Sequence, residues 1–391
     1  MSTAAPSAPP VENACKPEWL ELLQGLFECP TAPLMEDLPA KYVLDFAKAR
    51  PELSCSRDEV GNIYVGYPKS AESAAEPLIL VAHLDHPGFW VDRIDGNVVH
   101  LTFKGGVGLP HAVAGSKLRF FRRGERRAIG RGVLESASGE KGRLEKATAK
   151  VTSGIAEPGG YTMWDFPGYS FKKDKITARC CDDLGGAAAA LCVLHELARE
   201  QAPKACVWGL FTRGEELGFY GALSAVKRNR IPKNARVISL ECSRALPNAP
   251  QGAGVIVRIG DASSIFDPGF SESLRRAGQA QQKLDPNFKF QRRLMDGGTC
   301  EATVFCAEGL RSAGLALPLG NYHNQAGLDG GAKKIGAESI LASDFASEVK
   351  LLLELARLGP DISQFEKAHN ERLEKLGAEA EEAFKQIALK V

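Results

Sequence analysis

The spacing of apolar and polar positions differs between successive stretches of the chain. In the first, residues 17–27 keep helical spacing behind a proline, and residues 38–49 predict a second helix. The continuous apolar run at 78–82 is typical of a strand buried on both faces. From residue 88 to 175, short alternating pieces are separated by glycine, proline and charged residues. This middle stretch therefore predicts a small all-β module.

Beyond residue 175 the alternation of strands and helices returns. A nearly all-apolar segment at 185–199 predicts a buried helix, and a further helix is expected at 342–358, with several strands between the two. Such alternation is typical of layered α/β folds. We therefore expect an α/β protein, built as a three-layer α/β/α domain with a mixed central sheet, interrupted by a small inserted all-β domain.

The expected boundaries are 1–87 for the first part of the main domain, 88–175 for the inserted β domain, 176–360 for the second part of the main domain and 361–391 for a charged C-terminal helical extension. Apolar residues recur near heptad spacing in the extension. The pattern leaves open whether they pack on their own domain or on a partner subunit.

Overall charge gives no reason to expect nucleic acid as a partner, because 49 lysines and arginines balance 48 acidic residues. The basic segment 119–127 is a local exception, for which a solvated hairpin turn is favoured over a phosphate contact. The ten cysteines show no C-x-x-C spacing, and several lie in apolar runs, which suits buried thiols in a reducing compartment.

The N-terminus lacks the basic and apolar regions of a secretory signal, and no apolar run approaches the length that crosses a bilayer. We expect residues 1–13, rich in alanine, proline and serine, to be a mobile tail. The sequence therefore predicts a soluble, cytoplasmic protein with no membrane partner.

Side chains suited to metal binding stand at the ends of predicted strands or in the loops that follow them. In open α/β sheets ligands gather at the carboxyl ends of strands. Each motif alone is weak, since H-x-D is more often a structural pair and Asp-Asp before a helix is usually a cap. Together, two histidines, one aspartate and two glutamates form a nitrogen and oxygen set that suits zinc, cobalt or manganese. A pair of metals also needs a shared carboxylate and a further carboxylate as base, and the chain supplies both.

The ordered motifs AHLDHPGF, ARCCDDLGG, FTRGEELGFYGA, LEC, GGT and YHN resemble those of the glutamyl or deblocking aminopeptidase family of di-metal peptidases, known for tetrahedral assemblies. More distantly they resemble the wider zinc aminopeptidase and carboxypeptidase superfamily. The resemblance runs from the GNIYVGY segment to about residue 358, and the family carries a small β domain at the same place. It implies an aminopeptidase that acts on short peptides, holds two divalent metal ions and forms a symmetric homo-oligomer. Zinc is the expected metal, with cobalt and manganese as alternatives.

Carried over position by position, the resemblance implies a role for each motif residue. The implied metal ligands are His83 and Glu241 on the first ion, Glu216 and His323 on the second, and Asp182 as the bridge between them. Asp85 is implied to orient His83, and Asp183 to start the following helix. Glu215 is implied to be the general base that takes a proton from the attacking water and passes it to the leaving amine.

The chain departs from the family pattern at three places. Glu241 stands where the family usually has aspartate, Leu184 where it has arginine, and Cys300 where it has the aspartate of G-G-T-D. Substrate specificity is therefore not carried over. A di-metal carboxypeptidase or amide deacylase on the same core remains an alternative, as does a catalytically silent binding or scaffold relative. The retained Glu215 and ligand set count against the silent form.

Other histidines and cysteines received weaker assignments. His86 is expected to support the site or lie at the surface, His195 to be a packing residue, and His111 to be a loop residue of the insertion. Cys180 and Cys181, beside the predicted bridging aspartate, lack zinc-finger spacing and are not expected to bind metal.

Overall fold

The computed structural model describes residues 15–68 and 76–387, and the tail predicted at 1–13 lies outside this part of the chain. A mixed eight-stranded sheet forms the centre, with strand order β1-β2-β12-β3-β13-β16-β14-β15. The four strands β12, β3, β13 and β16 run parallel, whereas β1, β2 and β14 each pair antiparallel with a neighbour. The strands are β1 (Ser54–Arg57), β2 (Ile63–Tyr67), β3 (Leu78–His83), β12 (Val207–Thr212), β13 (Arg236–Arg244), β14 (Val255–Gly260), β15 (Phe290–Leu294) and β16 (Arg311–Leu319).

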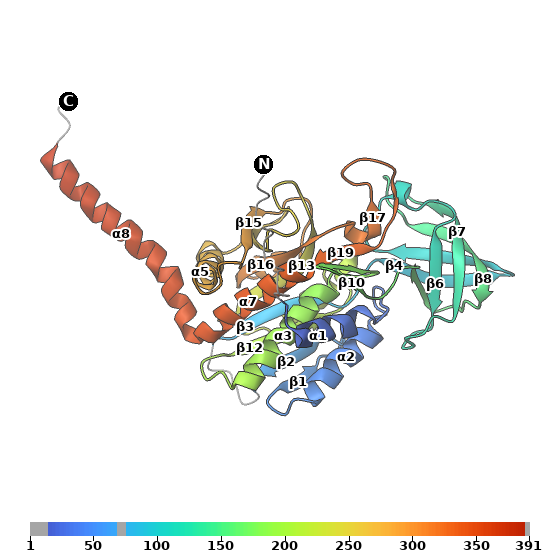
Figure 1. Ribbon diagram of the computed structural model, residues 1–391, viewed down its shortest axis with the longest axis horizontal. Coiled ribbons are helices and arrows are strands. Elements are labelled where there is room, and N and C mark those ends of the chain that lie inside the picture. The colour runs from blue at the N-terminus through green and yellow to red at the C-terminus, as the bar shows by residue number, and fades with distance from the viewer. Residues whose placement is uncertain (1–14, 69–75, 388–391) are drawn as a thin grey trace, which may run out of the picture.

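Helices cover both faces of this sheet (Figure 1). One face packs against α1 (Pro17–Phe27), α2 (Asp37–Lys48), α3 (Leu184–Glu200), α5 (Pro268–Leu284) and α7 (Ala342–Leu358). The other face packs against α4 (Tyr220–Lys227) and α6 (Ala302–Ala307). The predicted three-layer α/β/α fold with a mixed sheet is confirmed.

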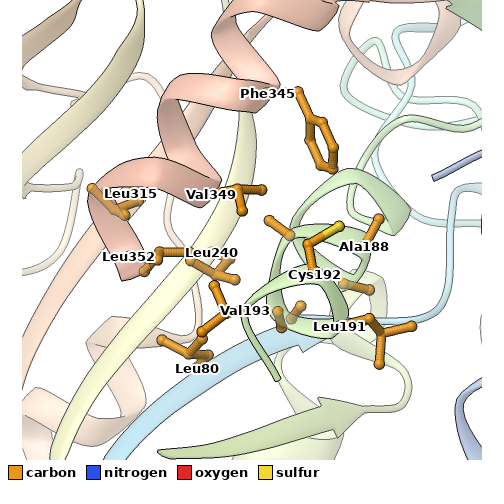
Figure 2. Packing of buried hydrophobic residues seen from close by; sticks show 14 of the residues in the cluster. Leu80, Ala188, Leu191, Cys192, Val193, Leu240, Leu315, Phe345, Val349 and Leu352 are labelled. Atoms are coloured by element: carbon orange, nitrogen blue, oxygen red, sulfur yellow. The ribbon is translucent and has the colours of Figure 1, made fainter. Parts of the chain in front are cut away.

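Helix α3 lies at the middle of the larger core because it is apolar almost all round. Val193 of α3 lies beside Leu80 and Leu240 of the sheet, and Val349 of α7 adds to the same cluster from the neighbouring helix (Figure 2). This packing fixes the start of α3, which is where the candidate site begins.

A separate closed antiparallel barrel forms the β-rich region, with strand order β4-β5-β8-β7-β6-β9 (Figure 1). Its strands are β4 (Gly88–Asp95), β5 (Val98–Lys104), β6 (Lys117–Phe121), β7 (Gly130–Ser138), β8 (Lys146–Gly154) and β9 (Tyr161–Trp164). Phe89, Leu101 and Phe120 belong to its own apolar core. Between residues 88 and 175, all of which are described, the only helical residues form the 3₁₀ turn η1 (Leu109–His111). The inserted all-β module is therefore confirmed.

Smaller sheets join the barrel to the main domain. Strands β10 (Ser170–Lys172) and β11 (Lys175–Ala178) pair with β19 (Glu338–Leu341), and β17 (Gln325–Ala326) pairs with β18 (Lys334–Ile335). The predicted boundaries of the inserted domain at residues 88 and 175 stay predictions.

The extension forms one long helix, α8 (Ile362–Gln386), after the 3₁₀ turn η4 (Gly359–Asp361). It runs away from the body of the molecule (Figure 1). Leu373, Leu376 and Phe384 are exposed instead of packing on the chain's own domain. Of the two packing modes that the sequence left open, contact with a partner subunit stays a prediction. Within the described ranges, none of the helices has the length and apolar character needed to cross a bilayer.

A buried carboxylate ties α1 to α3. The Glu196 side chain is 2% exposed and accepts hydrogen bonds from Lys16 Nζ at 2.8 Å, Trp19 Nε1 at 2.8 Å and Arg199 at 2.5 Å. Burial raises the pKa of Glu196, but the hydrogen bonds from Lys16, Arg199 and Trp19 outweigh burial and lower its pKa to about 2.

We predict that Glu196→Gln lowers the free energy of unfolding by about 2 kcal/mol at pH 7, because the charge-assisted hydrogen bonds weaken. A carboxylate whose pKa is lower in the folded state stabilises above its unfolded pKa of about 4.3, and this stabilisation is lost as the pH falls toward 2. Urea unfolding at several pH values should therefore show the difference from wild type shrinking on the acid side. Glu21→Gln, on the exposed face of α1, is the matched control and should change stability little at any pH.

Candidate metal centre

The candidate residues meet at the carboxyl edge of the parallel strands. His83 is the last residue of β3, and Glu241 lies in the second half of β13. Glu215 and Glu216 follow β12, and His323 follows β16 in the 3₁₀ turn η3 (Tyr322–Asn324). Parallel strands bring their carboxyl ends to one edge of a sheet, so residues far apart in the sequence converge there.

Asp182 lies between the two histidines, just before α3. Its Oδ1 is 3.7 Å from His83 Nε2, and its Oδ2 is 3.4 Å from His323 Nε2. The two oxygens of one carboxylate therefore face different imidazoles, as a bridging ligand requires. The Asp182–Asp183 peptide bond is cis.

Asp183 starts α3, as the sequence predicted, because its Oδ1 accepts a hydrogen bond from the Gly186 amide at 3.0 Å. A Cβ atom on Gly186 would lie 2.5 Å from that same oxygen and 2.8 Å from Leu240 Cβ. The glycine therefore lets Asp183 cap α3 while the start of this helix packs closely against Leu240 of β13.

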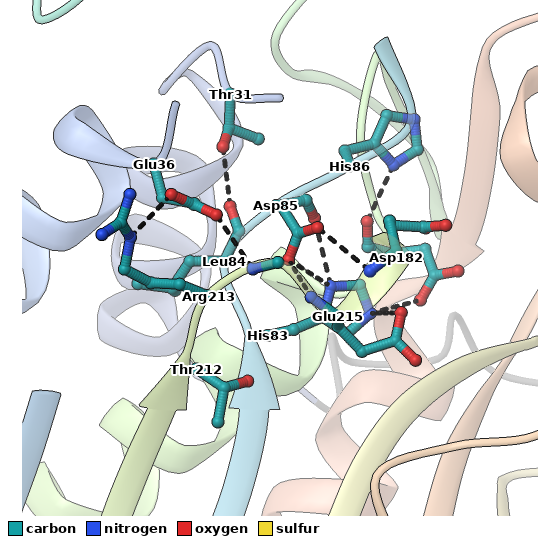
Figure 3. Close-up of polar contacts among 12 residues, drawn as sticks. Thr31, Glu36, His83, Leu84, Asp85, His86, Asp182, Thr212, Arg213 and Glu215 are labelled. Carbon is teal, nitrogen blue, oxygen red and sulfur yellow. Dashed lines mark hydrogen bonds and ion pairs between the residues drawn. The ribbon is translucent and has the colours of Figure 1, made fainter. Parts of the chain in front are cut away.

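The two histidines present Nε2 to the site because their Nδ1 atoms are engaged elsewhere. His83 Nδ1 lies 3.2 Å from the Asp85 carbonyl and 3.6 Å from Asp85 Oδ1 (Figure 3). His323 Nδ1 lies 2.7 Å from the carbonyl oxygen of Gly106, in the barrel region. With Nδ1–H as the donor in both rings, each Nε2 is free to bind a metal.

Carboxylates surround both imidazoles. Burial disfavours the charged form of His83, but Glu215, Asp182 and Asp85 outweigh burial and raise the pKa of His83 well above its ordinary value. Glu216 and Asp182 do the same for the pKa of His323. The site thus attracts cations strongly, and protons compete with metal ions for the same nitrogens.

Asp85 also fixes the glutamate pair. Its Oδ1 accepts from the Glu215 amide at 3.0 Å and its Oδ2 from the Glu216 amide at 3.1 Å (Figure 3). Glu36 holds the preceding turn by accepting from the Gly214 amide at 3.0 Å and from Arg213 Nε at 2.8 Å. Asp85 therefore contacts His83 and also holds the backbone of the turn that carries Glu215 and Glu216, a contact that the sequence did not indicate.

Glu215 and Glu216 point to different histidines. Glu215 Oε2 is 3.8 Å from His83 Nε2, and Glu216 Oε1 is 3.0 Å from His323 Nε2. They lie in the 3₁₀ turn η2 (Glu215–Leu217), so their side chains diverge within a turn and not along an extended strand. Burial raises the pKa of Glu215 well above its ordinary value. The neighbouring carboxylates of Glu241, Glu216 and Asp85 add to this shift, and His83 opposes it.

Glu241 is 7% exposed, and its Oε1 has no hydrogen-bond partner. Burial raises the pKa of Glu241 to about 8; Asp182 and Glu301 add to the shift, while His83 and Arg258 oppose it. A buried carboxylate oxygen without a donor is costly unless a cation approaches it. Glu241 lies outside the compact group of His83, Asp182 and Glu216, whose ligand atoms are all within 4.8 Å of one another.

These observations fit metal binding at this edge of the sheet. Glu241 Oε1 is a buried oxygen that accepts no hydrogen bond, Glu216 Oε1 faces His323 Nε2, and Asp182 faces two imidazole nitrogens. Asp182, Asp183 and Cys242 form a second group of possible metal ligands, whose ligand atoms lie within 4.8 Å of one another. Burial raises the pKa of the Cys242 thiol well above its ordinary value, so the thiol stays protonated and donates to the Cys181 carbonyl at 3.3 Å.

Several residues outside the predicted ligand set support the backbone around Asp182. His86 was expected to support the site or lie at the surface; it is buried, with Nδ1 2.8 Å from the Asp182 carbonyl and Nε2 3.0 Å from Asn324 Oδ1. Glu338 Oε2 accepts from the amides of Cys181 and Asp182 at 2.6 and 3.2 Å. The YHN motif carried a signal for Asn324, whereas Glu338 lies in no motif.

A cavity of ≈ 260 Å³ opens onto the site. Glu215, Glu216, Tyr322 and His323 line it, and Arg143 of the barrel region joins them. The barrel thus contributes a cation to the wall, and no motif in the sequence signalled this residue.

The three positions that depart from the family pattern differ in their surroundings. Leu184 is a buried first residue of α3. Cys300 is also buried, and its amide donates to Asp261 Oδ2 at 3.0 Å. Burial opposes the charge of the nearby Arg258, but Cys300 and Glu241 outweigh burial and raise the pKa of Arg258. Cys300 is thus a buried residue whose backbone is held by Asp261.

The remaining histidine and cysteine candidates have contacts of other kinds. His195 Nδ1 accepts from Arg50 Nε at 3.2 Å, which confirms its packing role. His111 Nδ1 is 3.3 Å from the Lys334 carbonyl. Burial raises the pKa of the Cys180 and Cys181 thiols well above the ordinary value, which disfavours thiolate binding of a metal.

Comparisons with known proteins bear on family and fold. Residues 61–329 match the sequence profile of the M42 glutamyl aminopeptidase family. A search of curated protein sequences finds no match. Among solved structures, the chain is similar to the aminopeptidase APDkam598 from the archaeon Desulfurococcus kamchatkensis, at 18% identity and a TM-score of 0.72 over 90% of this chain and 97% of that one.

Two further structures share the fold. One is a TET aminopeptidase from the marine sediment archaeon Thaumarchaeota archaeon SCGC AB-539-E09, at 17% identity and a TM-score of 0.72 over 89% of this chain and 99% of that one. The other is the TET1 peptidase of Pyrococcus horikoshii, at 17% identity and a TM-score of 0.69 over 86% and 99%.

We predict that Asp85→Asn weakens metal binding about 10- to 100-fold, the range typical for residues that orient metal ligands. An amide group would replace one of the two oxygens that accept from Glu215 and Glu216, and would turn a donor toward a donor. Competition with a chromogenic chelator would measure the affinity. Asp45→Asn, an exposed change on α2, is the control, and equal affinities for the two variants would contradict the positioning role.

Proposed function

Because the chain belongs to the M42 glutamyl aminopeptidase family and is a hydrolase of the aminopeptidase class, we propose that it removes N-terminal residues from short peptides with two divalent metal ions and a water activated by Glu215. His83, Asp182, Glu216, Glu241 and His323 are the proposed ligands. Zinc is the proposed metal, with cobalt and manganese as alternatives, since imidazole and carboxylate ligands suit all three.

One observation carries this proposal: the carboxylate of Asp182 turns one oxygen toward His83 and the other toward His323. The adjacent glutamates then divide between the same two histidines, Glu215 on the side of His83 and Glu216 on the side of His323. A single ion would need no such duplication. The arrangement supports two positions that share Asp182.

The residues divide the chemistry between them. When bound, the two ions would polarise the scissile carbonyl and lower the pKa of the attacking water. Glu215 takes the proton of that water on its carboxylate and passes it to the leaving amine nitrogen. Burial raises the pKa of Glu215 above its ordinary value, the direction expected of a carboxylate that acts as a general base. Asp85 holds Glu215 in place through the backbone.

The setting supports three further parts of the proposal. The ≈ 260 Å³ cavity is small, which favours the end of a peptide over a folded chain. All ten cysteines are free, which favours a reducing compartment such as the cytoplasm. The exposed apolar side chains of α8 favour a homo-oligomer, and the structurally similar Pyrococcus horikoshii TET1 peptidase assembles into a tetrahedron or a large octahedral shell.

The decisive experiment compares matched short peptides that have free or acetylated N-termini, before and after chelation and re-addition of zinc, cobalt or manganese. We expect cleavage of the free peptides alone, abolished by chelation and restored by metal. Cleavage of acetylated peptides would support the carboxypeptidase or deacylase alternative instead. No cleavage with any metal would support the silent scaffold.

Glu215→Gln should lower kcat about 100- to 10,000-fold while metal content stays unchanged, because the general base is lost but no ligand is removed. His323→Ala is the contrasting variant and should reduce the bound metal below two ions per chain. Turnover assays together with elemental analysis would measure both effects. An active Glu215→Gln enzyme, or unchanged stoichiometry in His323→Ala, would remove the corresponding role.

A further inference from the structure

A second cavity, of ≈ 630 Å³, lies between the barrel and the end of α1 and shares no lining residue with the cavity at the metal centre. Its charged wall is strongly one-sided. The lining arginines are Arg119, Arg126, Arg127, Arg131 and Arg179, and Glu28 is the one lining carboxylate among the described residues. Five cations against one anion give this cavity a charge of +4, in a chain whose net charge is +1.

The basic segment 119–127 therefore has two parts. Arg122 and Arg123 are paired at the surface with Glu157 and Asp37, as expected of a solvated hairpin. Arg126 pairs loosely with Glu28 at 3.5 Å. Arg122 and Arg123 do not line the cavity, whereas Arg126 does.

Among the lining arginines, Arg127 and Arg131 lack acidic partners in the ranges that the structure describes, whereas Arg119 has one. Arg119 is paired with Asp165. Arg127 and Arg131 are exposed, and within the described part of the chain neither side chain has a hydrogen bond or an ion pair. These two arginines, at the end of the hairpin and the start of β7, are free to contact a ligand.

Arg179 is the buried member of the group. It is 4% exposed, and its Nε has no hydrogen-bond partner. Its other contacts are weak, since it donates to the Glu28 carbonyl at 3.3 Å and its Cζ lies 5.8 Å from the Phe121 ring. No carboxylate in the described residues pairs with this guanidinium. A buried charge without a counter-ion is costly, so this position favours an anion.

Glycines keep the buried arginine accessible from the cavity. Gly130, Gly154 and Gly168 line it and add no side chains. A Cβ atom on Gly168 would lie 3.3 Å from the Arg179 guanidinium and 3.0 Å from Glu28 Cα. A larger residue at this position would therefore crowd Arg179.

We propose that this cavity binds a small phosphate-bearing molecule, with Arg179 at its inner end and Arg127 and Arg131 at its rim. Guanidinium groups recognise phosphate oxygens with paired, charge-assisted hydrogen bonds. A phosphate monoester carries a charge of about −1.5 to −2, which suits several arginines better than a single carboxylate does. The cavity volume leaves room for an organic part beside the phosphate. This site is independent of peptide hydrolysis.

The test is isothermal titration of the full-length, metal-loaded protein with glycerol 2-phosphate at low ionic strength, with glycerol as the uncharged comparison. We expect saturable binding of the ester and none of glycerol. The double variant Arg127→Gln/Arg131→Gln should weaken binding by about tenfold or more, the effect of losing one to two charge-assisted hydrogen bonds. Inorganic phosphate in a parallel titration distinguishes the sources: equal affinity assigns recognition to the phosphate group alone, and weaker affinity shows that the organic part contributes.

Lys117→Gln/Lys150→Gln is the matched control, because it removes the same charge from exposed positions of the barrel that do not line the cavity. It should bind within about twofold of wild type. Equal losses in the two double variants would show general charge attraction and overturn the proposal. So would the absence of binding in the wild type, and so would a changed oligomeric state of the arginine variant without any binding, which would assign the arginines to a partner subunit. Arg179→Lys, which keeps the charge but loses the planar fork, should also weaken binding.

Discussion

The shared carboxylate of Asp182 is the interaction around which the other parts of the candidate centre are arranged. Burial opposes its charge, but the imidazoles of His323 and His83 outweigh burial and hold the pKa of Asp182 below its ordinary value. Its own backbone is fixed from behind, since Glu338 accepts from its amide and His86 lies against its carbonyl. A residue so constrained can present two oxygens in two fixed directions, which a side chain on a loose loop cannot do.

The concentration of acid around Asp182 imposes a physical constraint on the fold. Glu215, Glu216 and Glu241 bring further carboxylates into a nearly dry region. Such a set is stable when cations or protons neutralise it, so metal occupancy and protonation are linked in this protein. The barrel takes part in the same arrangement, because the Gly106 carbonyl fixes the His323 ring and Arg143 adds a positive charge to the cavity wall.

The sequence was most informative where a pattern has a direct structural cause. The apolar run at 78–82 implied a buried strand that ends at His83, and the predicted helix at 342–358 coincides with α7. Strand ends then brought the candidate ligands together. Contacts made by backbone groups, or by single residues that belong to no motif, could not be predicted from the sequence. The Gly106 carbonyl that orients His323 belongs to the backbone, so no side chain in the sequence indicates it. Glu338 contacts Asp182 from a distant strand. The surroundings of Arg179, including the adjacent Gly168, are visible only in the folded chain.

The position of the barrel in the chain has a consequence for biosynthesis. His83 leaves the ribosome before the barrel, Asp182 after it, and His323 near the end of the chain. His323 then takes its orientation from Gly106, which was made much earlier. Contacts between such distant segments form slowly, because long loops must close first. The candidate centre is therefore completed late, after the barrel strands have been synthesised, and a nascent chain that stops before η3 lacks one of its two histidines. The order of synthesis thus keeps unfinished chains from carrying a complete hydrolytic site.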